Sequence, residues 1–259
     1  MLKREIKINF KSFLIWVVSI SSLLTLIFSI YPSISKSMSI DSLMENLPAE
    51  LLKSFNFDLV SISTSFGWYA SEGFVIITLV GALYCAILGS NIILKEESDK
   101  TIDFLYSKPV TRNKILISKI IAGLIYMILF NVSIMIITGI GFSINGDMLI
   151  KEWLLLSLSP ILIQLAVFFV AAFIGTFFTK ARKAMGIVLG FVMGTYVLNM
   201  VAKMSDSVSF LKYFSPFGYV DSSSILKDGS LEISAVIIVG IAVIFMALLF
   251  KRYNHKELA

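Results

Sequence analysis

The chain has 259 residues, of which 57% are hydrophobic and only 15% are charged, and its mean hydropathy is +0.89. This composition excludes an ordinary soluble globular protein and predicts an all-α polytopic membrane protein. The formal net charge of +5 does not indicate a nucleic-acid partner, because the basic residues gather in particular segments between apolar runs. The single cysteine, Cys85, excludes an intramolecular disulfide, and the single histidine, His255, excludes a histidine-based metal site within one chain.

The N-terminal residues 1–12 alternate basic side chains with apolar ones at helical spacing. This pattern predicts an N-terminal amphipathic helix on the cytoplasmic surface of the membrane, in contact with lipid. The apolar run that follows is too long for the core of a cleavable signal peptide and suits a first membrane span. Pro32 is expected to end that span.

Six apolar runs are long enough to cross about 30 Å of hydrocarbon. The expected transmembrane helices cover residues 13–31, 72–94, 115–142, 153–178, 184–202 and 231–250. Lys119 lies near the start of the third span, and its ammonium is expected to extend toward the membrane surface. The six runs predict a single transmembrane domain over residues 1–259.

Residues 32–71 form the longest polar connection and are expected to be an outer loop. Apolar residues recur within it at i, i+3 and i+4 spacing, although the stretch is too charged to span the membrane. We favour a pair of interfacial helices packed on the bundle, and the alternative is a gate for a substrate. A second long polar connection, residues 203–230, precedes the sixth span.

The basic residues predict the orientation of the chain. With six spans, both termini lie on the same side of the membrane, and the segments on that side contain fifteen lysines and arginines. The segments on the opposite side contain only six, although they are longer. Because cytoplasmic loops carry the excess of basic residues, we expect both the N- and C-termini to be cytoplasmic.

The most charged connection, residues 95–114, is therefore expected to be cytoplasmic, between the second and third spans. It carries nine charged residues in twenty positions, which excludes it from the hydrocarbon. Ile102, Phe104 and Leu105 predict a short amphipathic helix within it, a shape suited to docking into a partner. Pro109 disfavours helix at the residue before it, and Thr111 is placed to cap the next helix.

The fifth span contains three glycines spaced four residues apart, Gly186, Gly190 and Gly194. Glycines at this spacing line one helix face and let another helix approach closely. The spacing alone leaves two alternatives, packing against a helix of the same chain and a seam between two copies of the chain.

Polar side chains inside the expected spans are few: Asn91, Asn131, Gln164 and Asn199, with Glu72 at an outer end. No carboxylate, lysine or histidine lies near the middle of a span, which weighs against a proton- or ion-coupled pump. We expect the amides to form hydrogen bonds between helices. The chain has no glycine-rich phosphate-binding loop, so we expect no catalytic residues and no enzymatic activity in it.

At residues 95–114 the sequence resembles the permease subunits of type-2 ATP-binding-cassette (ABC) transporters. The matching residues are Glu96-Glu97, Thr101-Ile102, Phe104-Leu105 and the run from Ser107 to Arg112. The six-span layout, the N-terminus and the outer stretch 47–52 also resemble this family, so the similarity covers essentially the whole chain. The sequence departs from the family at Ser98-Asp99-Lys100, where many members have a glycine before the threonine.

The resemblance implies the membrane subunit of an ATP-driven exporter in the plasma membrane of a prokaryotic cell. Two permeases, either two copies of this chain or this chain with a related permease, would pair and form the translocation path. They would sit on two copies of a cytoplasmic ABC ATPase subunit. ATP and Mg²⁺ would be bound by that partner, so this chain would need no cofactor or metal of its own.

The resemblance also implies roles for individual residues. Within the cytoplasmic coupling segment 95–114, residues 96–112 would be the coupling helix, seated in a groove of the ATPase. The implied coupling residues are Glu96, Glu97, Thr101, Phe104, Leu105, Pro109 and Arg112. Phe104 and Leu105 would anchor the helix, while the charged residues would contact the ATPase or hold the helix to the membrane surface. Because the family pairs its permeases largely through the first and fifth spans, the resemblance favours the glycines of the fifth span as a dimer seam.

A function of a different class is the alternative. The chain would then be a non-transporting membrane scaffold or sensor, whose segment 95–114 recruits a cytoplasmic partner without moving a substrate.

Overall fold

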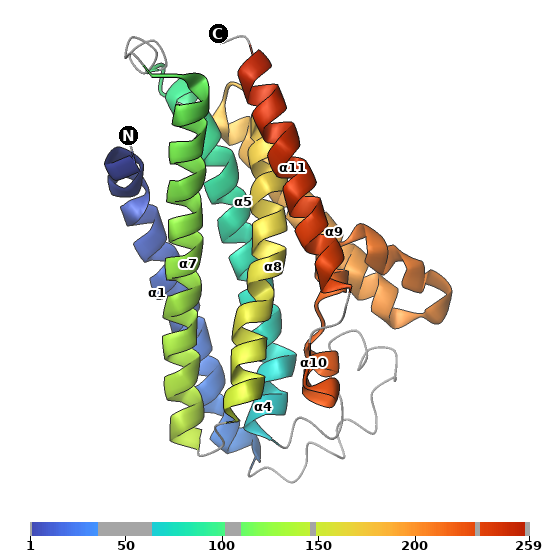
Figure 1. Ribbon diagram of the computed structural model, residues 1–259. Helices are drawn as coiled ribbons and strands as arrows, with labels where there is room; N and C mark the ends of the chain where they lie inside the picture. Colours follow the sequence, from blue (N-terminus) through green and yellow to red (C-terminus); the bar gives the residue numbers. More distant parts are fainter. Residues whose placement is uncertain (1, 36–63, 102–109, 146–148, 231–233, 257–259) are drawn as a thin grey trace.

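The computed structural model describes residues 2–35, 64–101, 110–145, 149–230 and 234–256, and every regular element in these ranges is helical (Figure 1). The long helices are α1 Leu2–Ser35, α5 Phe74–Ser98, α7 Arg112–Asn145, α8 Ile150–Gly175, α9 Ala181–Met204 and α11 Ala235–His255. The short elements are α4 Ser65–Trp68, the π-helical turn η1 Tyr69–Gly73, the 3₁₀ segments η2 Asp206–Phe214 and η3 Pro216–Tyr219, and α10 Ser222–Asp228.

Six helical stretches of the described residues are long and apolar enough to cross a membrane, which confirms the predicted number of spans. The prediction that Pro32 ends the first span is wrong, because α1 continues through it to Ser35. The second span starts at Ser65 rather than Glu72, since α4, η1 and α5 follow one another without a break. Thr64 caps this start, with its hydroxyl accepting the Gly67 N–H at 3.1 Å.

The sixth helix also starts later than expected, at Ala235 rather than at residue 231. Most of the predicted outer loop, residues 36–63, and the interfacial helix pair expected there lie outside the described residues.

The centre of the bundle is formed by α5 and α8. In both of these spans 67% of the most apolar window is buried inside the chain, against 28% in α1 and α9 and 22% in α11. Gly89 allows the close approach of the two helices, because an added Cβ there would lie 2.5 Å from the backbone oxygen of Phe168. Gly123 of α7 leaves room for the Phe168 ring in the same way.

Two of the amides inside the spans link neighbouring helices, as the sequence predicts. The Asn131 side chain on α7 donates to the Gln164 side-chain oxygen on α8 at 2.5 Å, and both residues are buried. Among the described residues, a buried oxygen of Asn199 has no hydrogen-bond partner, so this amide does not follow the expectation.

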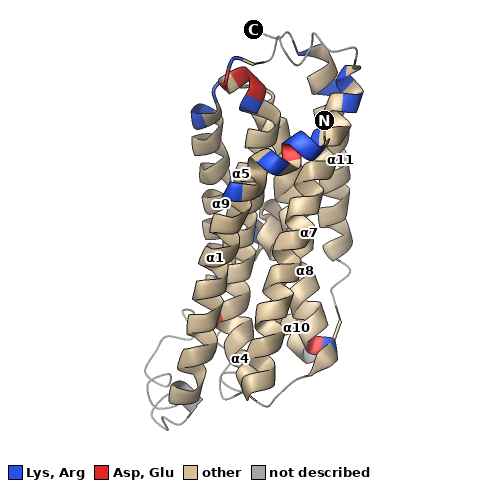
Figure 2. Ribbon diagram, turned by 90° about the vertical axis from the view of Figure 1, so that its left-hand side faces the viewer, with Lys and Arg blue, Asp and Glu red and all other residues tan. Residues whose placement is uncertain are grey.

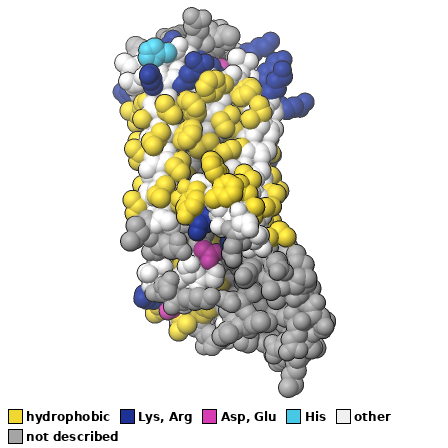
Figure 3. Space-filling view, turned by 90° about the vertical axis from the view of Figure 1, so that its right-hand side faces the viewer, with side chains coloured by type: hydrophobic (Ala, Val, Ile, Leu, Met, Phe, Trp, Pro, Cys, Tyr) yellow, Lys and Arg dark blue, Asp and Glu magenta, His cyan; other side chains and the backbone are white. Residues whose placement is uncertain are grey.

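Basic residues gather at one end of the bundle, which we call the basic end. It contains residues 2–11, 95–101, 110–114, 180–183 and 251–256. Figure 2 shows this concentration of lysine and arginine, and Figure 3 shows hydrophobic side chains covering the middle of one face below it. The apolar middle is consistent with helices whose outer faces contact lipid.

The first turns of α1 lie at the basic end and run across the bundle rather than along it (Figure 2). They are continuous with the first span, so residues 2–12 are not a separate helix. Glu5 is buried, whereas the basic side chains of these turns, Lys3, Arg4, Lys7 and Lys11, are exposed. The Tyr126 hydroxyl of α7 donates to the Ile6 carbonyl and fastens this segment to the bundle.

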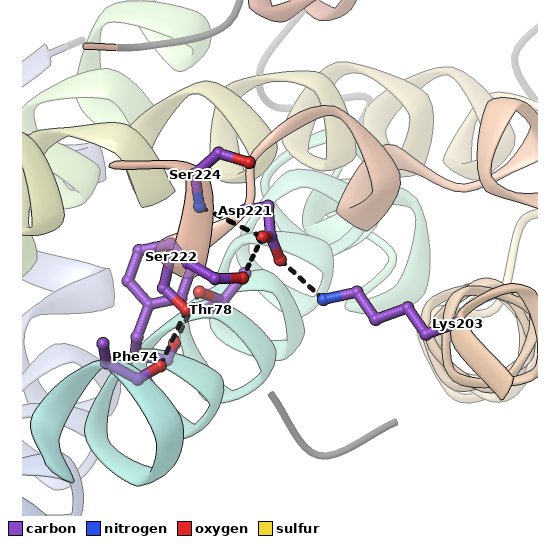
Figure 4. A network of polar contacts seen from close by, with 8 residues as sticks. Phe74, Thr78, Lys203, Asp221, Ser222 and Ser224 are labelled. Carbon is purple, nitrogen blue, oxygen red and sulfur yellow. Dashed lines mark hydrogen bonds and ion pairs between the residues drawn. The ribbon is translucent and has the colours of Figure 1, made fainter. Parts of the chain in front are cut away.

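At the opposite end, the connection of residues 203–230 folds into η2, η3 and α10. Lys203 forms an ion pair with Asp221 at 2.6 Å, and Asp221 also accepts the Ser224 N–H at 3.3 Å as the cap of α10 (Figure 4). The Ser222 hydroxyl donates to the Ala70 carbonyl at 2.8 Å, which ties α10 to η1. The sequence analysis did not predict these elements, because each is too short to produce a helical periodicity.

Candidate functional site

The described part of the 95–114 segment begins with a well-defined end to α5. The Lys100 N–H donates to the Glu97 carbonyl at 3.2 Å, and the Thr101 N–H donates to the Glu96 carbonyl at 2.8 Å. This pair of bonds is a Schellman motif, which requires a left-handed residue just after the helix. Lys100 has that conformation, with φ of 54°, at the position where many members of the resembled family have glycine.

Lys100→Gly is expected to raise the free energy of unfolding by about 1 kcal/mol, because glycine adopts a left-handed conformation without the steric cost of a Cβ. Lys100→Val is expected to lower it, since a β-branched residue is strained at positive φ. Thermal unfolding of the purified protein in detergent measures both effects. Equal stability of the two variants would contradict the turn described here.

The far side of the segment is capped as predicted. α7 begins at Arg112, and the Thr111 hydroxyl accepts the Lys114 N–H at 3.4 Å. The Arg112 guanidinium donates to the Asn254 and Lys256 carbonyls at 3.2 and 3.0 Å. A cation at the C-terminus of α11 complements the partial negative charge of that helix end.

A second ion pair joins α5 to the end of α11. Lys256 contacts the Glu97 carboxylate at 2.6 Å, and only 9% and 4% of the two side chains are exposed. The same ammonium donates to the Phe178 carbonyl at 2.9 Å, in the turn between α8 and α9. Lys256 therefore connects three parts of the chain that are far apart in the sequence.

A third contact joins α5 to α7. The Lys119 ammonium lies 2.5 Å from the Glu96 carboxylate, and it also donates to the Ile92 carbonyl at 2.5 Å. Only 2% and 4% of the Lys119 and Glu96 side chains are exposed. The prediction that Lys119 extends to the membrane surface is wrong, because the buried carboxylate on the facing helix supplies a stronger partner than distant water.

We call these three contacts, Glu96–Lys119, Glu97–Lys256 and Arg112 with the α11 end, the polar clamp. The polar clamp holds both ends of residues 102–109 to the rest of the bundle. Of the predicted coupling residues, Glu96, Glu97, Thr101 and Arg112 lie in it or in the turn beside it. Phe104, Leu105 and Pro109, with the short helix predicted around them, lie outside the described residues.

The sequence analysis missed Lys119 and Lys256 as members of the polar clamp. A signal for Lys119 was present, because a lysine within an apolar run requires a buried partner and Glu96 is one of the four carboxylates between the second and third runs. No signal marked Lys256, which lies in a charged tail and pairs with a residue more than a hundred positions away.

The three glycines of α9 line an open face. Gly186, Gly190 and Gly194 are exposed, and an added Cβ would find no atom of the described chain within 4 Å at any of them. Packing against another described helix of the same chain is therefore excluded. No group of three or more potential metal-ligating side chains occurs among the described residues.

A family model of ABC-2 family transporter proteins matches residues 1–258. Comparison with curated proteins and with solved structures found no match. The match extends over the six spans, the polar clamp and the connection between α5 and α7. The chain therefore belongs to the ABC-2 family of transporter proteins, and its resemblance to the permeases of type-2 ABC transporters is confirmed.

Proposed function

We propose that the chain is the permease subunit of an ATP-driven ABC exporter, working as a dimer with a separate cytoplasmic ATPase. The observation that carries this proposal is the polar clamp at the two ends of residues 102–109. A segment that only connected two spans would need no such fastening. A segment that receives a force from a partner would need it, because the force must reach the spans.

The helices that adjoin the segment suit this role. α5, on one side, packs closely against α8, while α7, on the other, is fastened to α5 through Lys119. A displacement of residues 102–109 would therefore move the centre of the bundle rather than bend a loop. ATP-driven closure of the ATPase pair would in this way rock the spans as rigid bodies. ATP and Mg²⁺ would be bound by the ATPase, and this chain would do no hydrolysis.

The contacts that Glu96, Glu97 and Arg112 make within the chain support one of the two roles considered for them, that of holding the coupling helix in place. These residues would position the coupling helix, and Phe104 and Leu105 would be its contacts with the ATPase. We propose a cytoplasmic location for the basic end in the plasma membrane, supported by the gathering of lysine and arginine there (Figure 2).

Co-purification in mild detergent with a candidate ABC ATPase, followed by ATP turnover with and without this chain, tests the proposal. Phe104→Asp is expected to weaken the stimulation of ATP turnover at least about tenfold, since the aromatic side chain proposed to contact the ATPase would be replaced by a charge. Phe104→Leu is the matched control and is expected to keep most of it. Lack of any complex with a correctly inserted protein would favour the scaffold instead.

The open glycine face of α9 supports pairing of two permeases along this helix. Gly190→Leu is expected to reduce the dimer fraction by at least about tenfold, because close approach of two helices requires a small residue there. Gly240→Leu on α11 is the matched control, since its Cβ also meets no atom within 4 Å. Light scattering coupled to size-exclusion chromatography measures the dimer fraction of both variants. A dimer fraction in Gly190→Leu equal to that of the wild type would rule out the glycine face as the dimer interface.

A further inference from the structure

A cavity of about 220 Å³ lies at the basic end, between the first turns of α1, the last turns of α5 and the start of α9. Figure 2 shows these three elements beside one another at the end where lysine and arginine gather. Tyr84, Asn91 and Lys95 contribute one face of α5 to its lining, at i, i+7 and i+11 spacing. Asn9 and Ser12 contribute from α1. The polar clamp lines none of it.

The inner end of the lining, farthest along α5 from Asp99, consists of Tyr84, Ile87 and Leu88. Tyr84 is only 2% exposed, and its ring is held in place by Trp16 and Phe130, whose centroids lie 5.8 and 4.7 Å away. This end of the cavity therefore suits the carbon chain of a ligand better than a charged group.

The mouth of the cavity favours a negative group. Lys95 is half-buried, and no carboxylate of the described residues lies within ion-pair distance of its ammonium. Ala181, the first residue of α9, lines the cavity, and Lys180 before it provides no side-chain cap. The Lys183 N–H already donates to the Lys180 carbonyl at 3.1 Å, so an anion would be bound by the N–H groups of Ala181 and Arg182. Phosphate is the group most often bound at a helix start in this way.

The charges around the mouth are mostly positive. Asp99 at the rim is the one acidic residue in the lining. The lining also contains Lys95, and exposed basic residues stand next to lining positions at Lys7, Lys11, Lys180 and Arg182. The buried Glu5 of α1 is a further acidic residue near Lys95. A ligand with a net negative head therefore fits better than a neutral one.

We propose that this cavity binds an anionic phospholipid, with its phosphate between Lys95 and the start of α9 and its glycerol and first acyl carbons directed toward Tyr84. From Asp99 to Tyr84 the lining extends about 22 Å along α5, from the charged rim into the apolar span. This change from polar to apolar lining matches a lipid better than a soluble phosphate. The site does not depend on the proposed transport function or on an ATPase partner.

Native mass spectrometry of the full-length chain tests the site. The protein is purified in mild detergent, mixed with equal amounts of phosphatidylglycerol and phosphatidylcholine, and the lipids that stay bound are counted. The wild-type chain is expected to retain phosphatidylglycerol at least about tenfold more strongly than phosphatidylcholine. Soluble glycerol phosphate is expected not to displace it, because it lacks the acyl part that reaches toward Tyr84.

Two variants should abolish this preference. Lys95→Gln removes the cation at the mouth while keeping a polar side chain of similar length. Ser12→Asp places a carboxylate in the lining from an exposed position, so its effect does not depend on a change in folding. Lys114→Gln, which removes an exposed lysine at the basic end outside the cavity, is the matched control and should retain the lipid as the wild type does.

Three results would overturn the proposal. Retention of phosphatidylglycerol by Lys95→Gln and Ser12→Asp at the wild-type level would place the lipid elsewhere. An equal loss of bound phosphatidylglycerol in Lys95→Gln and Lys114→Gln would mean that the general surface charge, and not the cavity, holds the lipid. Displacement by soluble glycerol phosphate, or equal retention of phosphatidylcholine, would mean that the cavity does not select an anionic lipid.

Discussion

Lys119→Met is expected to lower the free energy of unfolding by about 3–5 kcal/mol, the usual effect of removing one partner from a buried ion pair. The Glu96 carboxylate would lose its cation at a position where only 4% of its side chain is exposed. Its other oxygen already has no hydrogen-bond partner among the described residues, so nothing described nearby replaces the ammonium. Chemical or thermal unfolding in detergent, followed by tryptophan fluorescence, measures the loss.

The double variant Lys119→Met with Glu96→Gln separates the charge from the packing. With no charge left to desolvate, its stability is expected to return to within about 1 kcal/mol of the wild type. Lys114→Met on the same helix is the control and should change stability by less than about 0.5 kcal/mol, because Lys114 is exposed. A double variant as unstable as the single one would show that the stabilisation comes from side-chain shape and not from the ion pair.

Gly89→Ala is expected to lower the free energy of unfolding by about 2–3 kcal/mol, because it disturbs the contact between α5 and α8. The added Cβ would lie 2.5 Å from the Phe168 backbone oxygen, which is fixed in a helix and cannot rotate away as a side chain can. To remove this steric overlap, α5 and α8 must move apart, and the close packing around them is then lost. The midpoint of thermal unfolding measures the loss.

Gly240→Ala is the matched control for the same added methyl group. Gly240 lies on α11 and is exposed, and an added Cβ there would meet no atom of the described residues within 4 Å, so no loss of stability is expected. Similar destabilisation by the two substitutions would mean that a general effect of alanine, and not the α5–α8 contact, is responsible.

The two predictions concern the same mechanical property. The polar clamp links the ends of α5, α7 and α11, and at Gly89 the helix α5 lies in close contact with α8. In the proposed exporter these contacts would transmit a force from residues 102–109 to the spans. Variants that loosen them while leaving the chain inserted should therefore reduce transport before they reduce assembly with an ATPase.

Some features of the site could be predicted from the sequence because they depend on neighbouring residues. The cap by Thr111 follows from a threonine before a helix start and a proline two residues earlier. The open glycine face of α9 follows from spacing within one helix, although the spacing could not exclude a partner from the same chain. The left-handed conformation of Lys100 was not predicted. The only signal for it was that many members of the family have glycine at this position.

Other features were missed because their energy comes from residues far apart in the chain. A proline is a strong local signal for a helix end, yet α1 continues through Pro32. A lysine near a helix start is a strong local signal for exposure, yet Lys119 is buried against Glu96. Lys119 is buried because its ion pair with Glu96 on another helix outweighs that local preference. Past Pro32 the helix α1 continues for only three residues, to Ser35.

The sequence by itself determined that the chain crosses a membrane six times and has its charged connection between the second and third spans. Both follow from the cost of placing charge and unpaired backbone in hydrocarbon, which depends on composition over about twenty residues. Only the tertiary structure decided which charges are buried together, because ion pairs such as Glu97–Lys256 require two distant segments to meet. The same reason explains why the cavity lined by α1, α5 and α9, the proposed lipid site, has no counterpart in any one stretch of sequence.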